Sequence, residues 1–175
     1  MKILKNILIV ILVLIGILLI TAAFLPKEFR SERAIVIEKP QHEVFDYIKY
    51  VKNQDNFGVW QLMDPEMKTS ETGVDGTVGF KYSWEGNKTG KGSQTITHIA
   101  EGERIDTELD FGFGEPAHAY FITDSEGGDR TRVTWGMHGR SPYPWNIMGL
   151  FFDVGDDFEE GLENLKEIME ARPNP

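Results

Sequence analysis

Apolar and polar side chains alternate with a period of two through much of residues 80–138, and this alternation most constrains how the chain folds. In residues 104–111 the side chains of Ile105, Thr107, Leu109 and Phe111 share one parity, with charged residues between them. That period places successive side chains on opposite faces of a pleated strand. Glycine-rich turns separate similar segments at 80–84, 93–99, 117–123 and 132–138. The pattern predicts consecutive antiparallel strands in a curved meander.

The predicted hairpin at residues 81–99 carries aromatic and polar side chains on one face. Its first strand places Phe80, Tyr82 and Trp84 on this face, and its second strand adds Gln94, Ile96 and His98 to the same face. His98 is close to the strand end, where a bulge would turn it outwards. An apolar wall with a few hydrogen-bonding groups is typical of a cavity for an organic ligand. A filled core can have the same composition, so both interpretations stay open.

After residue 145 the period with which apolar residues recur changes from two residues to about 3.6. Apolar residues then follow one another at spacings of three and four: Ile147, Leu150, Phe151, Val154, Phe158, Leu162, Leu165 and Met169. This predicts one long amphipathic helix over residues 146–171, with a kink near Gly155. Its apolar stripe has to cover the concave side of the sheet. We expect a cavity between the two, because a strongly bent sheet does not close completely around a helix.

Residues 28–66 are expected to contain a strand at 28–38, ended by Pro40, and a short amphipathic helix at 43–51. A weak strand is expected at 67–70.

Residues 7–25 form an uncharged apolar run of 19 residues. As a helix the run would extend roughly 28 Å, close to the thickness of a bilayer's hydrocarbon core. We therefore predict a single-pass anchor in residues 1–26. A cleaved signal peptide is the alternative, because Lys2 and Lys5 precede the run and small residues stand near its end at 21–23. Basic residues flank both ends, so their count leaves the orientation open, and the signal-like start favours a domain outside the cytoplasm.

Charge and composition exclude several classes of function. The formal net charge is -10, from 28 acidic against 18 basic residues, which argues against nucleic-acid binding. The chain has no cysteine, so disulfides, thiolate metal sites and thiol nucleophiles are excluded. Its four histidines lie on separate predicted elements without metal-binding spacing. We predict no metal site and no cofactor.

Several short motifs together resemble the SRPBCC, or START-like, superfamily, and within it the polyketide cyclase/dehydrase and lipid-transport-like proteins with an N-terminal membrane segment. The resemblance covers nearly the whole chain and rests on Pro40-x-x-Glu43-Val44-Phe45, Trp60, Tyr82-Ser83-Trp84-Glu85-Gly86, Thr95-Ile96-Thr97, Arg104-Ile105, Val133-Thr134-Trp135 and Asn146-Ile147-Met148-Gly149-Leu150-Phe151. It implies an α+β helix-grip fold for residues 27–175. In that fold a curved antiparallel sheet wraps a long C-terminal helix around a hydrophobic cavity.

Parity, together with the implied fold, gives a set of candidate ligand-binding residues: Phe80, Tyr82, Trp84, Gln94, Ile96, Thr107, Leu109, His118, Tyr120, Trp135, Phe151 and Phe158. Gln94 and His118 depart from the apolar and small residues common at these positions in the family. His118 and Tyr120 are the one pair that parity places together as candidate acid and base. No catalytic residue of the family can be carried over position by position.

The sequence favours a membrane-anchored protein that binds a hydrophobic or amphipathic small molecule, such as a lipid. Two alternatives remain, and each makes a distinct prediction. A cyclase- or dehydratase-type enzyme acting on a polyketide-like substrate would need His118 or Tyr120 for activity. A protein-interaction module would have a cavity filled by its own side chains.

Overall fold

The structure is a computed structural model that describes residues 2–151 and 153–172. Its helices are α1 (Lys2–Phe24), α2 (Gln41–Ile48), α3 (Val59–Met63) and α4 (Val154–Glu170), with 3₁₀ helices η1 (Val51–Asn56) and η2 (Trp145–Leu150). Its strands are β1 (Glu28–Ile37), β2 (Lys68–Thr72), β3 (Lys81–Gly86), β4 (Gly90–Ala100), β5 (Arg104–Asp110), β6 (Ala117–Ser125) and β7 (Thr131–Arg140).

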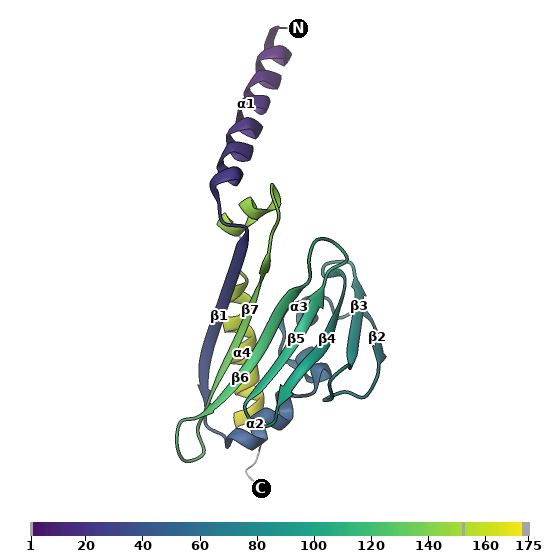
Figure 1. Cartoon of the computed structure of the whole chain (residues 1–175), viewed down its shortest axis with the longest axis vertical. Coiled ribbons are helices and arrows are strands. Elements are labelled where there is room, and N and C mark those ends of the chain that lie inside the picture. The colour runs from purple at the N-terminus through teal and green to yellow at the C-terminus, as the bar shows by residue number, and fades with distance from the viewer. Residues whose placement is uncertain (1, 152, 173–175) are drawn as a thin grey trace.

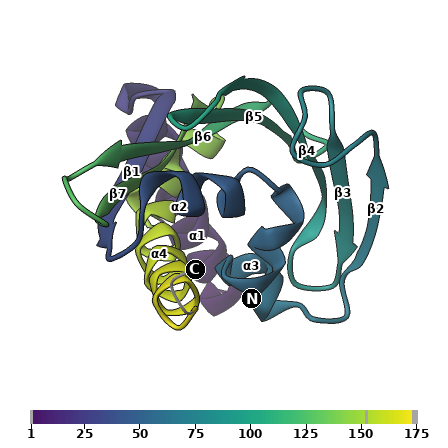
Figure 2. The ribbon, with the colours of Figure 1, turned by 90° about the horizontal axis from the view of Figure 1, so that it is seen from below.

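The strands form one seven-stranded sheet in the order β1-β7-β6-β5-β4-β3-β2. All neighbouring strands are antiparallel, and β1 pairs with the last strand, β7. The sheet curves around α4, and α2 and α3 lie on the same concave side (Figures 1 and 2). This confirms the predicted α+β helix-grip fold.

Side-chain parity in the central strands follows the sequence pattern. In β5, Ile105 and Thr107 are buried on the concave side, and Asp106 between them is partly exposed. The pairing of β4 with β5 shifts register between Ile96 and His98. As predicted, this irregularity turns His98 outwards, where its Nδ1 lies 3.2 Å from a carboxylate oxygen of Asp106.

The predicted long C-terminal helix is two helices, and this part of the prediction was wrong. η2 ends at Leu150, and α4 begins at Val154 because Asp153 caps it by accepting a hydrogen bond from the Gly155 N–H at 2.8 Å. Asp153 also accepts hydrogen bonds from Ser31 at 2.8 Å and Arg33 at 3.0 Å, which fastens the start of α4 to β1. Phe151 therefore lies outside the amphipathic stripe.

Large aromatic residues fill the space between the sheet and α4. The ring of Trp135 stacks between those of Phe121 and Phe158, with centroids 4.8 Å away on each side. Phe57 meets the Trp135 ring edge-on at 5.8 Å. Gly161 in α4 is required for this packing, because a Cβ there would lie 2.7 Å from the Trp135 ring. The helix therefore approaches the sheet closely at this point.

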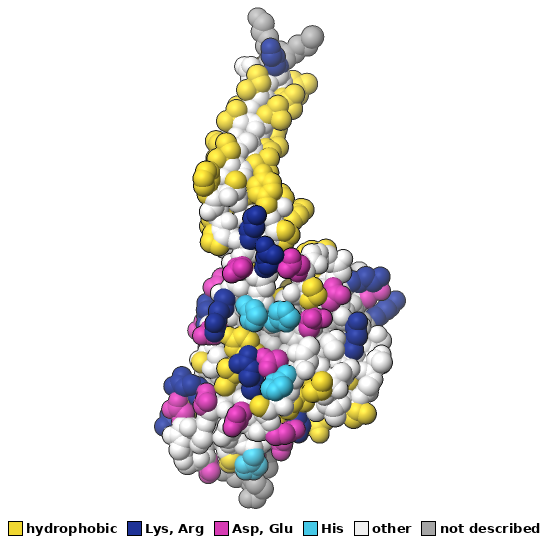
Figure 3. Space-filling view, viewed as in Figure 1, with side chains coloured by type: hydrophobic (Ala, Val, Ile, Leu, Met, Phe, Trp, Pro, Cys, Tyr) yellow, Lys and Arg dark blue, Asp and Glu magenta, His cyan; other side chains and the backbone are white. Residues whose placement is uncertain are grey.

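Antiparallel pairing gathers three features at one end of the sheet. The β3–β4 turn, the β5–β6 turn and the start of β1 all lie at this end, which is also where α1 joins the domain (Figure 1). α1 is covered with apolar side chains along its length, unlike the mixed surface of the domain (Figure 3). By length and composition it could cross a membrane, and an N-terminal signal sequence would meet the same criterion.

Candidate functional site

A pocket with a volume of about 420 Å³ lies between the concave face of the sheet, α3 and the first turns of α4. This volume is within the range of small-molecule sites. The larger apolar residues of its wall are Trp60, Trp84, Leu109, Phe111, Trp135 and Phe158. These side chains come from α3, β3, β5, β7, α4 and the residue after β5, so the wall forms only in the folded chain.

Trp60 joins the pocket wall to the aromatic core. Its ring meets Phe158 edge-on at 5.8 Å and Trp135 edge-on at 6.4 Å between centroids. Edge-to-face contacts of this kind hold aromatic rings in fixed orientations. This side of the pocket is therefore a preformed apolar surface.

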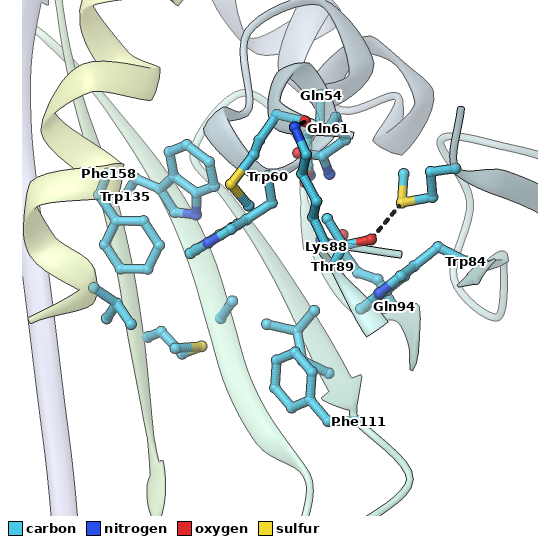
Figure 4. A pocket seen from close by; sticks show the side chains of 16 residues that line it. Gln54, Trp60, Gln61, Trp84, Lys88, Thr89, Gln94, Phe111, Trp135 and Phe158 are labelled. Carbon is cyan, nitrogen blue, oxygen red and sulfur yellow. Dashed lines mark hydrogen bonds between the residues drawn. The ribbon is translucent and has the colours of Figure 1, made fainter. Parts of the chain in front are cut away.

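Polar side chains gather on the opposite side of Trp60 (Figure 4). Gln54 is only 5% exposed, and its side chain lines the pocket. The buried Oε1 of Gln61 lacks a partner among the described residues. Lys88 reaches this region from the β3–β4 turn and donates a hydrogen bond from Nζ to the Met63 carbonyl at 3.0 Å. The Gln61 oxygen is available to a polar ligand atom, because buried amides otherwise find partners.

Asp64 holds the β3–β4 turn against the end of α3. Its Oδ2 accepts hydrogen bonds from the backbone N–H of Lys88 at 2.8 Å and of Thr89 at 3.3 Å. The Lys88 N–H bond is the main cause that lowers the pKa of the Asp64 carboxyl. The ionised carboxylate therefore fixes Lys88 at the edge of the pocket.

A second polar pair secures the segment that carries Gln54. The Tyr82 hydroxyl donates a hydrogen bond to Oδ1 of Asp55 at 2.8 Å. Burial raises the pKa of the Asp55 carboxyl, and burial together with this hydrogen bond raises the pKa of Tyr82. The pair connects η1 to β3 beside the pocket.

The predicted ligand-binding residues fall into three groups. Five of them line the pocket: Trp84, Gln94, Leu109, Trp135 and Phe158. Four are buried in the adjacent core and do not line the pocket: Phe80, Tyr82, Ile96 and Thr107. Gln94 donates a hydrogen bond to Thr107 at 3.2 Å, so its amide is partly satisfied within the protein. The remaining three, discussed next, lie elsewhere.

Phe151 was expected on the pocket side and is 67% exposed near η2. His118 and Tyr120 were expected in the cavity, and the structure places them on the convex face. The physical reason is that Ala117, Ala119 and Phe121 occupy the concave parity of β6, which leaves His118 and Tyr120 on the opposite parity.

On the convex face Tyr120 is a structural residue. Its ring lies over Gly136, and a Cβ added to Gly136 would come within 2.4 Å of the Tyr120 ring. The Tyr120 hydroxyl donates a hydrogen bond to Glu32 at 2.5 Å. Arg30 donates to the same hydroxyl at 3.2 Å. Burial and the Glu32 bond raise the pKa of Tyr120. The His118 ring lies 5.4 Å from that of His138, also outside the pocket.

Four polar pocket residues are absent from the predicted set: Gln54, Gln61, Lys88 and Thr89. They lie in short helices and a turn, where no hydrophobic period indicates which way a side chain points. No group of three His, Cys, Asp or Glu residues within the described ranges is placed to hold a metal ion.

Comparisons with known proteins agree with the fold. The sequence matches the family model described as "Polyketide cyclase / dehydrase and lipid transport" over residues 28–170. No curated protein matches the chain. Among solved structures, truncated norcoclaurine synthase from Thalictrum flavum has a TM-score of 0.68 at 8% identity, covering 83% of this chain and 96% of that one.

Two further structures show the same fold. The Aha1 dimer from Colwellia psychrerythraea has a TM-score of 0.59 at 12% identity, with coverage of 82% of this chain and 97% of that one. Protein CV1439 from Chromobacterium violaceum has a TM-score of 0.56 at 14% identity, with coverage of 84% and 99%. At such identities the likeness concerns the fold alone. The family model spans most of the chain, and the protein therefore belongs to the polyketide cyclase / dehydrase and lipid transport family of the SRPBCC superfamily.

Proposed function

We propose that this protein is a membrane-anchored binding protein for an amphipathic lipid with one apolar chain and a compact polar head. The observation that carries the proposal is the pocket, whose apolar wall adjoins polar side chains that include the buried Oε1 of Gln61, an atom with no hydrogen-bond partner among the described residues. The chain would lie against Trp60, Trp135 and Phe158. The head would accept hydrogen bonds from Gln54 and Lys88.

The size of the apolar wall is sufficient for useful affinity. Burying about 300 Å² of apolar ligand surface at roughly 25 cal/mol/Å² would contribute about 7.5 kcal/mol before association costs. Binding near or weaker than micromolar follows without further contacts. The polar group then selects among ligands of similar apolar area, because an unpaired buried amide favours a ligand that can satisfy it.

We assign residues 1–26 as the anchor and residues 27–175 as the ligand-binding domain, outside the cytoplasm. The apolar run of residues 7–25 supports an anchor over a cleaved signal peptide, whose apolar core is typically about 7–15 residues long. Ala22 lies within the helix and is 1% exposed, so the end of α1 packs against the domain. An anchor would also keep the pocket near the bilayer, into which amphipathic lipids partition.

A catalytic role in the pocket has less support. The described residues that line it include no His, Asp or Glu. Lys88 is their one strongly basic group, and it is already paired with a carbonyl. Norcoclaurine synthase, which shares the fold, has been solved with dopamine and hydroxybenzaldehyde. Its 8% identity to this chain transfers no catalytic residue.

A titration with a fluorescent fatty acid tests the proposal, using the full chain in mild detergent. We expect saturable binding near the micromolar range. Lys88→Met should weaken binding of the fatty-acid carboxylate about fivefold, because an exposed ion pair contributes about 1 kcal/mol to the binding free energy. Binding of the matching fatty alcohol, which has no charge, should be unaffected.

Lys91→Met is the matched control for this titration. Lys91 belongs to the same hairpin but pairs with Glu85 at 2.9 Å and does not line the pocket. Absence of saturable binding by the wild type would contradict the proposed function. An equal loss in both lysine variants would contradict the role of Lys88.

A further inference from the structure

An apolar surface lies at the end of the domain where α1 joins it. Its members are Phe113 in the β5–β6 turn and four residues in or next to η2, namely Trp145, Met148, Leu150 and Phe151. We call this surface the apolar collar. Trp145 is 66% exposed and Phe113 is 80% exposed, although large aromatic side chains are usually withdrawn from water.

Asn146 fixes the height of the collar relative to α1. Its side-chain Nδ2 donates hydrogen bonds to the carbonyls of Ala22 at 2.8 Å and Leu25 at 3.1 Å. The last carbonyls of a helix have no partners within the helix, and here a collar segment supplies one. η2 is therefore held level with the final turn of α1 (Figure 1). If α1 spans a bilayer, that level is the membrane interface, where tryptophan is enriched.

The collar also adjoins the pocket. A second hollow lies beside β1 and η2, and it is lined by the collar residues Met148 and Leu150 and by Leu25, the residue that follows α1. This hollow shares Met137 and Val154 with the ligand pocket. Lys88 and Phe111, at the pocket's edge, belong to the two turns at the same end of the sheet.

We propose that the collar inserts into the surface of the bilayer that α1 crosses, so that the pocket opens onto the membrane. Lipid would then pass beside η2, along Met137 and Val154, without crossing bulk water. This inference rests on the proposed function for the passage of lipid. The insertion itself rests on the height of η2 at the end of α1 and on the exposed apolar residues there. A bilayer covers such a surface without a partner protein.

Fluorescence quenching by brominated lipid tests the insertion. The full chain is placed in nanodiscs of phosphatidylcholine with bromine near the top of the acyl chains. Trp145 is one of four tryptophans, and the other three line the ligand pocket. We expect the wild type to lose up to about a quarter of its emission compared with discs without bromine. Trp145→Phe should lose clearly less, because the remaining tryptophans lie inside the ligand pocket and not on the collar.

Equal fractional quenching in the wild type and in Trp145→Phe would overturn the insertion. If the wild type and Trp145→Phe are equally quenched in discs that hold two copies of the chain, the collar would instead be covered by the second copy. That result would also overturn the insertion.

A second variant separates the collar from ligand binding. Met148→Ser combined with Phe151→Ser should slow uptake of the fluorescent fatty acid from vesicles at least fivefold. The affinity measured in detergent should stay unchanged, because neither residue lines the ligand pocket. Unchanged uptake would contradict the passage of lipid beside η2. Quenching of Trp145 in a protein that binds no lipid would refute the proposed function and leave the insertion standing.

Discussion

Replacing Trp135 by alanine is expected to lower the free energy of unfolding by about 3–5 kcal/mol, the usual cost of removing a large buried aromatic side chain. Trp135 is 4% exposed and its ring stacks on Phe121 and Phe158, one on each side. It joins the sheet to α4, so its loss leaves a cavity between the two layers. Urea unfolding of the full chain in mild detergent, followed by circular dichroism, measures the change.

Trp145→Ala serves as the control for this stability measurement. Trp145 is exposed and stacks on no described ring, so its removal should change the free energy of unfolding by no more than about 0.5 kcal/mol. If the two variants were equally stable, the assignment of Trp135 as the centre of the core would be wrong.

Replacing Ala119 by phenylalanine is expected to weaken fatty-acid binding about 100-fold. Ala119 lies on β6 and faces the pocket, so a phenyl ring there would occupy space meant for the ligand. Losing about 100 Å² of buried ligand surface costs about 2.5 kcal/mol, which corresponds to nearly two orders of magnitude in Kd. The fluorescent fatty-acid titration measures this loss directly.

The matched control adds the same side chain outside the pocket. Ala34 lies on β1 and is exposed on the opposite face of the sheet, so Ala34→Phe should leave the affinity unchanged. Melting temperatures of both variants show whether each remains folded. Unchanged affinity in a folded Ala119→Phe protein would place the ligand elsewhere.

The sequence predicted side-chain directions best where one hydrophobic period continued through a whole strand or helix. The alternation in β5 identified Ile105 and Thr107 as inward-facing, and the spacing in α4 identified Phe158 and Leu162 as buried. Both predictions hold because burial of one face decides which way a regular element is oriented. Trp135 was placed on the pocket side for the same reason.

The prediction of inward-facing residues failed in β6, where residues of both parities could plausibly face the pocket. In β6 the large side chains of His118 and Tyr120 suggested a pocket face, but the small Ala117 and Ala119 share the buried parity with Phe121. Small residues on that parity are what create the space. The packing of Tyr120 over Gly136 depends on a partner on the neighbouring strand, and a single strand's pattern does not reveal it.

Short irregular segments were the other source of error. Gln54 and Gln61 lie in η1 and α3, each six residues long or shorter, so no period fixes the direction of their side chains. The break before α4 depends on Asp153, whose bonds to Ser31 and Arg33 bridge more than 100 positions of sequence. Such long-range contacts are set by the folded topology and are invisible in a local pattern.

Native mass spectrometry of the full-length protein, purified in mild detergent from its own host, tests the central claim most directly. The account predicts one bound amphipathic lipid per chain in the wild type, present in Ala34→Phe and absent in Ala119→Phe. Organic extraction of the complex would identify that lipid. A wild-type protein that has the mass of the bare chain, and gains nothing on incubation with host lipids, would contradict the claim that the pocket holds a lipid.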